Sequence, residues 1–211
     1  DGLCWNNNTS ELLGSTIEVG DIKLRVLAPD HDVADEYKPK EPDELGAYLD
    51  DWHIDLRTLI DNVDDDDIDE RGPNSQSIII LAECEGKKLL LPGDSTPEEL
   101  CDALQSYNKI NGAPLELDFM KCPHHGSTRN VTKNILDEIT CSNFIISTKK
   151  NKKYYFPNKE TIAKLIRYRE SSDKAINVYF NYQESLDVLG ITAEELTENN
   201  INLNVCNEFN F

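Results

Sequence analysis

The chain has 211 residues, of which 38% are hydrophobic, and a formal net charge of −19. This length is typical of one domain, and that apolar share can build a core. No apolar run approaches the roughly 18 residues of a membrane span, and the first residues lack the basic start and apolar stretch of a signal peptide. We therefore expect a cytoplasmic protein that does not bind membranes. Its six cysteines include no Cys-x-x-Cys pair, which favours reduced, buried thiols over a zinc ribbon.

The first part of the chain is predicted to hold a β-hairpin and then an acidic insertion. Residues 15–28 are expected to form the hairpin, turned at Gly20-Asp21. Residues 43–60 carry apolar side chains at three- and four-residue steps, which predicts a helix. Residues 61–73 include four consecutive aspartates, and we expect a mobile loop there because the segment is too charged to pack. Within a domain of residues 1–211, residues 30–73 would form this acidic helix and loop, and the spacing of a calcium loop is absent.

The rest of the chain alternates strands and helices. A second hairpin is expected at residues 77–83 and 87–91, turned at Glu85-Gly86. Pro97 is predicted to begin a helix over residues 97–107, with Thr96 as its N-cap. Further strands are expected at residues 115–121, 144–147, 176–180 and 201–205, and further helices at residues 131–139, 158–170 and 192–198. This alternation favours an α/β layered fold.

Two predicted strand ends carry the residues with the richest chemistry. The apolar run 89–91 stops at a Gly93-Asp94 turn, and the strand at 115–121 stops at a turn that presents His124 and His125. Carboxylate and imidazole groups are ligands for divalent metals, and strand ends can hold them rigidly. Either turn alone is common on protein surfaces. Both together, each after its own strand, favour a metal site.

The ordered series of motifs resembles a known family. It runs from Asn74 and Ser77 through the Gly93-Asp94 pair and the Lys-Cys-Pro-His-His-Gly-Ser stretch at residues 121–127 to the Ile-Ser-Thr at residues 146–148. This order is similar to the second half of metallo-β-lactamase-fold hydrolases, above all the branch with the hydrolase domain of ComEC-type DNA-uptake proteins and many stand-alone bacterial enzymes. The resemblance covers roughly residues 15–170. It implies a four-layer αββα sandwich of which this chain is the C-terminal half.

The resemblance also implies a role for each motif residue. Asp94 would bridge two divalent ions, zinc or alternatively manganese, and His125 would be a terminal ligand. His124 would act beside the metals or contact phosphate, although the choice of ligand between the two histidines stays open. The candidate catalytic residues are therefore Asp94 and His124, and the candidate substrate-binding residues are Lys121, Gly126, Ser127 and Asn74. Gly126 and Ser127 would offer backbone N–H groups to a phosphate, unless Ser127 only caps the next segment, and Asn74 is expected mainly to brace its loop.

The family's other metal ligands are missing from this sequence. They belong to an H-x-H-x-D-H motif in the first half of the fold, whereas this chain has only four histidines, at positions 31, 53, 124 and 125, with no two so spaced. Two ligands are too few to hold metal firmly. The sequence also opens at a hairpin similar to the one that begins the second half. We therefore expect a poor enzyme alone, completed by an N-terminal half that is either a cleaved or a separately encoded chain.

Charge is distributed unevenly, which bears on the substrate. Residues 30–70 contain seventeen acidic and three basic residues, whereas residues 118–170 contain eleven basic and five acidic. Where relatives carry a His-Pro pair, this chain has aromatic residues at 154–156, which could stack on a base or simply pack. A phosphodiester substrate, and hence a nuclease, is the favoured prediction. The alternatives are hydrolysis of another ester, such as a small phosphoester, lactone or thioester, and a catalytically degenerate regulatory or scaffold module.

Overall fold

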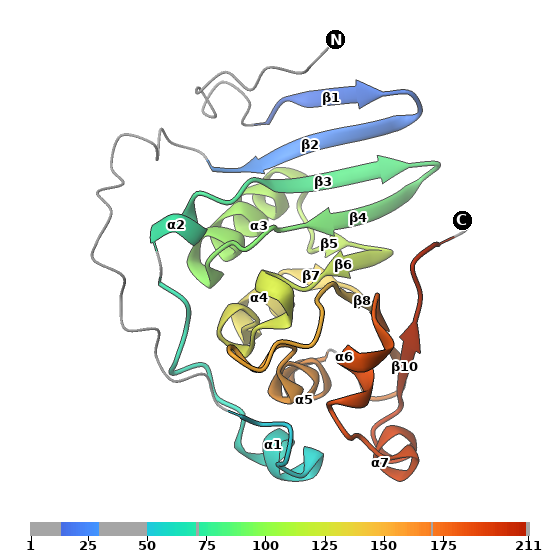
Figure 1. The fold of residues 1–211 in the computed structure, drawn as a ribbon. Coiled ribbons are helices and arrows are strands. Elements are labelled where there is room, and N and C mark those ends of the chain that lie inside the picture. Colours follow the sequence, from blue (N-terminus) through green and yellow to red (C-terminus); the bar gives the residue numbers. More distant parts are fainter. Residues whose placement is uncertain (1–13, 30–49, 71, 170, 210–211) are drawn as a thin grey trace.

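The computed structural model describes residues 14–29, 50–70, 72–169 and 171–209 (Figure 1). Within these ranges the chain is mixed α/β, as the alternating pattern predicts. An eight-stranded sheet has the order β1-β2-β3-β4-β6-β8-β9-β10, and β5 pairs with β7 in a separate two-stranded sheet. The strands of the large sheet are β1 (Thr16–Val19), β2 (Ile22–Ala28), β3 (Ile79–Cys84), β4 (Lys87–Leu91), β6 (Phe119–Lys121), β8 (Asn143–Ile146), β9 (Ile176–Phe180) and β10 (Ile201–Val205).

The large sheet changes character at β4. Strands β1 to β4 pair antiparallel, whereas β4, β6, β8, β9 and β10 pair parallel. Parallel strands point the same way, so the C-terminal ends of β4, β6 and β8 meet at one edge of the sheet. Loops at that edge are the usual place for a ligand site in α/β proteins. Both motif turns of the sequence lie there.

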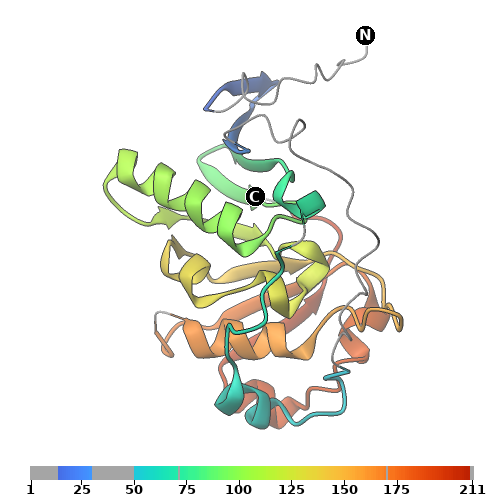
Figure 2. The same cartoon turned by 90° about the vertical axis from the view of Figure 1, so that its left-hand side faces the viewer.

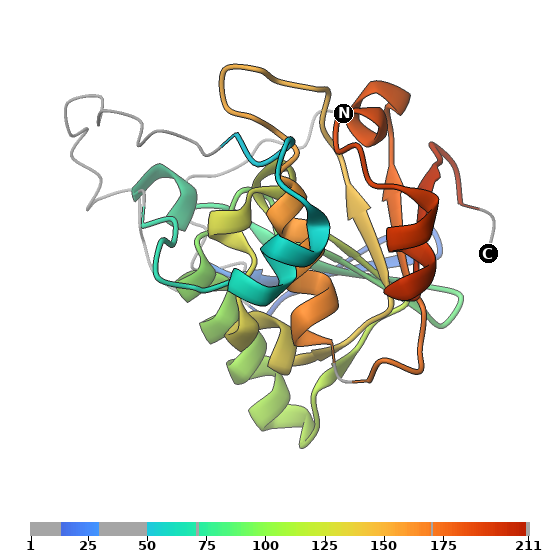
Figure 3. The ribbon, with the colours of Figure 1, turned by 90° about the horizontal axis from the view of Figure 1, so that it is seen from below.

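Helices cover one face of this sheet. Figures 2 and 3 show α3, α4 and α5 along the same side, with α1 packed outside α5. The helices are α1 (Leu56–Asn62), α2 (Gly72–Ser75), α3 (Pro97–Asn111), α4 (Lys133–Asp137), α5 (Lys159–Tyr168), α6 (Gln183–Asp187) and α7 (Ala193–Glu198). Between sheet and helices lies the apolar core, in which paired residues Leu81, Leu90, Met120, Phe144 and Val178 run across five strands.

Local sequence signals account for several elements as predicted. The first hairpin turns at Gly20-Asp21, and the second at Glu85-Gly86, where both residues have positive φ, as tight hairpin turns require. Helix α3 begins at Pro97, with the Thr96 side chain accepting a hydrogen bond from the Glu99 N–H. These predictions are confirmed because the signals act over only a few residues.

Other boundaries differ from the prediction. Of the helix expected over residues 43–60, residues 43–49 lie outside the described part, and the helix α1 begins only at Leu56, with Asp55 as its cap. Trp52 is buried and lies in the turn that precedes this helix. Its Nε1 donates a hydrogen bond to the Pro157 carbonyl at 2.8 Å. The strand expected over residues 115–121 is divided into β5 (Leu115–Glu116) and β6, which belong to different sheets, and β7 (Ile139–Thr140) was not predicted.

The described part of the acidic segment contacts the helices. Asp65 accepts hydrogen bonds from the Lys133 N–H at 2.8 Å and from the buried Lys164 Nζ at 2.9 Å. Asp67 pairs with Arg129 at 2.8 Å. The expectation that this run is too charged to pack did not foresee these partners, which are the cations of Lys164 in α5 and Arg129 in the η4 turn (Thr128–Asn130) and a backbone N–H of α4. In the part of the chain that the structure describes, no helix has the length and apolar character to cross a bilayer.

Candidate functional site

The Gly93-Asp94 turn follows β4 and lies against two other segments. The Gly93 carbonyl accepts hydrogen bonds from the His124 N–H at 3.1 Å and from Lys121 Nζ at 3.3 Å. The Asp94 N–H donates to Ser77 Oγ at 3.3 Å. Gly93 has φ +63°, and a Cβ there would lie 3.3 Å from the Ser77 Cβ. These contacts fix the backbone from which the Asp94 carboxylate projects.

The histidine turn follows β6 and has an unusual backbone. His124, His125 and Gly126 have φ values of +42°, +61° and +78°, so three successive residues are left-handed. Each non-glycine residue in this region costs on the order of 1–3 kcal/mol and persists only where its surroundings enforce it. Gly126 cannot be replaced easily, because a Cβ would lie 3.0 Å from Ile146 Cγ2. The fold thus maintains strain in order to present both imidazoles.

His125 and Asp94 face one another across the two turns. His125 Nε2 and Asp94 Oδ2 are 4.0 Å apart, and the side chains are 46% and 43% exposed. The other ring nitrogen, Nδ1, is 3.1 Å from the Ser147 carbonyl oxygen. A carbonyl only accepts, so Nδ1 carries a proton, and in the neutral form of the ring Nε2 would hold the lone pair. Two electron-rich groups in this arrangement are stabilised by a cation between them, or by protonation of the ring.

This geometry suits two ligands of a divalent metal, and the backbone carbonyl that orients His125 is typical of metal-binding histidines. It does not complete a site. Among the described residues, no group of three or more His, Cys, Asp or Glu side chains is placed to hold a metal ion. Zinc sites take three or four protein ligands per ion. Asp94 and His125 are therefore fewer ligands than one zinc ion takes.

His124 has a different, buried environment. Its Nδ1 lies 3.1 Å from Oδ2 of Asp69, which is 1% exposed. The same oxygen accepts from Asn74 Nδ2 at 2.6 Å and from Asn130 Nδ2 at 2.9 Å. Because the carboxylate only accepts, it places the His124 proton on Nδ1 and directs Nε2 away from the network. Asp69 thereby fixes both the tautomer and the orientation of His124.

The other predicted site residues lie near the two turns, and some of them form hydrogen bonds with neighbouring protein groups. Lys121 Nζ donates to the carbonyls of Gly93 and of Cys122, the latter at 3.2 Å. Burial lowers the pKa of Lys121 below its usual range, and the nearby Asp94 carboxylate acts in the opposite direction. Lys121 thus brings a partly desolvated cation to the edge that carries Asp94. Asn74 braces the Asp69 network, as the sequence suggested.

Gly126 and Ser127 play a structural part in this arrangement. The Gly126 N–H donates to the Pro123 carbonyl and the Ser127 N–H to the His124 carbonyl, both at 3.0 Å. The expectation that these N–H groups bind a phosphate therefore has no support here. Ser127 is fully buried, its side chain makes no capping hydrogen bond to η4, and its Oγ has no hydrogen-bond partner among the described residues.

Sequence reasoning missed two residues that shape the site, Asp69 and Asn130, and it named Ser147 and Phe156 without foreseeing their contacts with the histidines. Asp69 and Asn130 orient His124, the Ser147 carbonyl orients His125, and the Phe156 ring lies 5.4 Å from the His124 ring and 6.1 Å from the His125 ring. Asp69 was hidden in the acidic run, where nothing in the spacing separates it from the exposed aspartates. Asn130 follows the histidine motif closely, and that proximity was the available signal.

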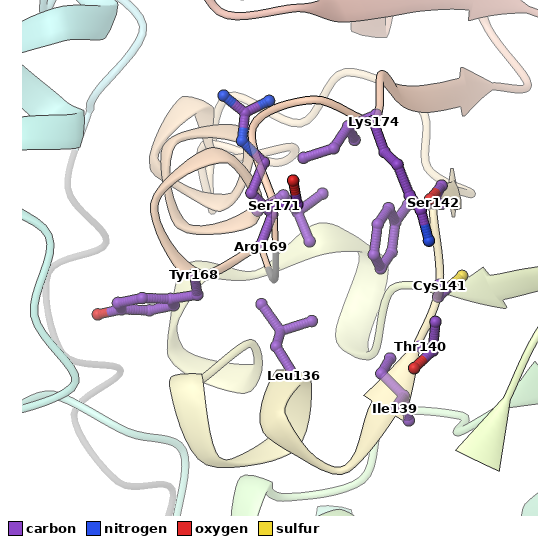
Figure 4. Close-up of a pocket in the computed structure, with 12 residues that line it drawn as sticks. Leu136, Ile139, Thr140, Cys141, Ser142, Tyr168, Arg169, Ser171 and Lys174 are labelled. Atoms are coloured by element: carbon purple, nitrogen blue, oxygen red, sulfur yellow. The ribbon is translucent and has the colours of Figure 1, made fainter. Parts of the chain in front are cut away.

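A small cavity lies away from this site, at the N-terminal ends of β8 and β9. It has a volume of about 50 Å³, and α4 and α5 form part of its wall (Figure 4). Cys141 lines it, but burial raises the pKa of this thiol to about 12, so the reactive thiolate is scarce at neutral pH. The cavity is therefore a gap in packing rather than a second candidate for catalysis.

Comparison with protein-family models and with curated proteins gives no match to this chain.

Proposed function

We propose that the chain contributes to a metal-dependent hydrolase that cleaves phosphodiester bonds, in the nuclease class. Asp94 and His125 would hold two divalent ions, zinc or alternatively manganese, together with an H-x-H-x-D-H segment supplied by an N-terminal half that is a cleaved or separately encoded chain. The observation that carries this proposal is the pairing of His125 Nε2 with the Asp94 carboxylate at 4.0 Å, with Nδ1 oriented by Ser147. An imidazole nitrogen and a carboxylate this close together, at the C-terminal edge of a parallel sheet, favour a bound cation.

The neighbouring side chains suit phosphoryl chemistry. Divalent ions, when bound, supply Lewis acidity and a nucleophile that is active at neutral pH. Lys121, held at the Gly93 carbonyl, would stabilise negative charge that develops on phosphate oxygens. His124, whose Nδ1 proton is held by Asp69, presents Nε2, which in the imidazolium form would donate its proton to the leaving oxygen and return the ring to its neutral form. The buried Asp69 carboxylate would stabilise the imidazolium form in that step.

A second half of the fold would complete both the ligand set and the layers. Arg25 lies over the Tyr107 ring of α3, so the alternate residue Leu24 faces away from the helices. By the same alternation, that far face carries the half-buried apolar residues Ile80, Leu89 and Phe119. An apolar sheet face supports packing against another layer. We therefore propose a four-layer αββα sandwich, with the H-x-H-x-D-H half supplied by a chain or segment outside the described residues.

The test uses the complete assembly, with bis(p-nitrophenyl) phosphate as substrate and elemental analysis of bound metal. Asp94→Ala and His125→Ala should abolish hydrolysis and reduce metal content, whereas His124→Ala should lose activity with milder metal loss. His53→Ala and Asp102→Ala are matched controls, because both side chains are exposed and belong to neither turn. If Asp94→Ala and His125→Ala kept wild-type metal stoichiometry, the ligand assignment would be wrong.

One observation favours a second candidate, a catalytically degenerate regulatory module. The described residues supply only two of the ligands that a dinuclear centre needs. In such a module His125 and Asp94 would simply form an ion pair with a protonated ring. Metal analysis separates the candidates, because the degenerate module would bind no zinc in the complete assembly.

A further inference from the structure

The segment that joins β8 to α5 forms a closed loop beside the histidine turn. We call residues 148–157 the lysine loop. The Asn151 N–H donates to the Phe156 carbonyl at 2.9 Å, and the Phe156 N–H donates back to the Asn151 carbonyl at 3.1 Å. Inside this closure, Asn151 Oδ1 accepts from the N–H groups of Lys153 and Tyr154, at 2.9 and 3.3 Å. The loop's conformation is therefore set by its own backbone, without a ligand.

The charge of this loop is opposite to that of the chain. Between Glu138 and Glu160 the sequence has no acidic residue, although the whole chain has a net charge of −19. The loop carries four lysines: Lys149, Lys150, Lys152 and Lys153. Three of these contact other side chains, since Lys149 lies 3.7 Å from Glu184, Lys150 packs over the Trp52 ring at 5.4 Å and Lys153 lies over the ring of its neighbour Tyr154. Lys152 and Lys153 are exposed at the tip, where they can meet an anionic ligand.

Aromatic rings connect the tip to the candidate site. Phe156 is 5% exposed and lies edge-on to the His124 ring at 5.4 Å. The Tyr154 ring follows at 6.1 Å from Phe156, and Lys153 Nζ lies 4.7 Å from the centre of the Tyr154 ring. Tyr154 is half-buried, so part of its surface faces solvent next to the two exposed lysines. The order from the site outward is imidazole, buried ring, half-buried ring, cations.

We propose that the lysine loop binds single-stranded nucleic acid and guides its backbone to the Asp94–His125 edge, an inference that rests on the proposed phosphodiesterase function. Lys152 and Lys153 would contact phosphates, and Tyr154 would stack on a base. Rings beside cations are how proteins hold single strands without reading sequence. A duplex keeps its bases stacked on each other and would offer the loop only its phosphates. The loop therefore distinguishes single strands from duplexes by access to a base.

Binding can be measured separately from cleavage, by fluorescence anisotropy in the presence of a chelator. The probes are a labelled single-stranded oligonucleotide of about 12 nucleotides and the duplex of the same sequence. Lys152→Gln with Lys153→Gln should weaken single-strand binding about tenfold and reduce the slope of log K against log salt by about 1.4. The control, Lys109→Gln with Lys174→Gln, removes the same charge from exposed positions elsewhere and should change neither.

The stacking contact has its own variants. Tyr154→Leu should weaken single-strand binding about tenfold and leave duplex binding unchanged, whereas Tyr154→Phe, which keeps the ring, should bind as the wild type does. Thermal unfolding of each variant checks that the loop still folds. Equal affinity of the lysine variant and its control would overturn the proposal, as would equal binding of single strand and duplex. Loop-dependent binding to anionic phospholipid vesicles, with none to oligonucleotides, would also overturn it.

The outcome is distinguishable from failure of the proposed function. If bis(p-nitrophenyl) phosphate is hydrolysed and the loop variants bind oligonucleotides like the wild type, the function stands and the loop inference fails. If single strands bind through the loop but no phosphodiester is cleaved by the complete assembly, the hydrolase fails and the loop remains a nucleic-acid binding site.

Discussion

The two ends of the parallel strands differ in what they hold. At the C-terminal ends of β4 and β6, left-handed backbone presents half-exposed Asp94 and His125, and no cavity is needed to bring them together. At the N-terminal ends of β8 and β9 there is a cavity, but its thiol, Cys141, is held in the unreactive form by burial. Among the described residues, this cavity and the candidate site thus lie at opposite ends of the parallel strands. Convergent polar groups on a strained backbone are the better guide to function.

Of the variants that test this comparison, Asp69→Asn on the buried side of the site should change turnover most. Asp69→Asn should lower the turnover of bis(p-nitrophenyl) phosphate by about a hundredfold, because an amide can donate to His124 Nδ1 and so favour the other tautomer. Nitrogen-15 NMR of the His124 ring would report the change in tautomer directly, which a merely structural role for Asp69 would not produce. The matched control is Asp67→Asn, which alters only an exposed pair with Arg129.

An unchanged tautomer together with unchanged turnover in Asp69→Asn would remove Asp69 from the site.

The strain itself can be measured through stability. Gly126→Ala should lower the free energy of unfolding by about 2–4 kcal/mol, since the new Cβ meets Ile146 at 3.0 Å and also occupies left-handed backbone. Gly86→Ala is a close control, because Gly86 has nearly the same φ, +77°, but no neighbour within 4 Å of a Cβ. Its cost should be about 1 kcal/mol. Urea unfolding of both variants measures these losses of unfolding free energy. Equal losses in the two variants would show that the histidine turn is not tightly packed.

A third prediction concerns a buried carboxyl group behind the lysine loop. Asp51 accepts a hydrogen bond from the Glu160 N–H at 2.7 Å, and burial raises its pKa from 3.8 to about 6. The folded state therefore binds this proton more tightly than the unfolded state, and stability should fall as pH rises from about 4 to about 6. Such a shift corresponds to about 3 kcal/mol. Asp51→Asn should remove that part of the pH dependence and raise stability at pH 7, because its amide oxygen can still accept the Glu160 bond.

Urea unfolding across this pH range checks the prediction, with the exposed Asp102→Asn as control. If the slope of stability against pH were the same in Asp51→Asn as in the wild type, the buried carboxyl would not be its source.

Local signals predicted much of the fold, and partners distant in sequence decided the rest. Thr96 with Pro97, and Glu85 with Gly86, act over a few residues, so α3 and the second hairpin were predictable. The division of residues 115–121 was not, because Asp118 accepts from the Lys88 N–H at 2.9 Å and separates β5 from β6. No pattern within those seven residues encodes a partner thirty residues away.

The candidate site shows the same division. Asp94, His124 and His125 were found because each motif follows its own strand, and parallel pairing of β4 with β6 brings the turns together. Asp69 was missed because its burial depends on Asn74 and Asn130, which come from separate segments. In the sequence it has the same neighbours as any solvated aspartate. Residue type was enough to identify Asp94, His124 and His125 as candidates. The part that Asp69 plays in orienting His124 is visible only in three dimensions.

The smallest expected effect is that of Cys141 in the cavity on phosphodiester turnover. It tests whether the cavity end of the strands takes part in the reaction. Cys141 Sγ donates to the Asn143 carbonyl at 3.2 Å, and a serine hydroxyl can make the same bond. Cys141→Ser should therefore leave phosphodiester turnover within about twofold of the wild type, since Cys141 lies at the opposite ends of the strands from Asp94 and His125 and touches no group assigned to the transition state. The native thiol should also react slowly with a disulfide reagent, because its raised pKa leaves little thiolate. A tenfold loss of turnover, or rapid modification of Cys141 that stops hydrolysis, would move the chemistry to the cavity end of the strands and reverse the assignment made here.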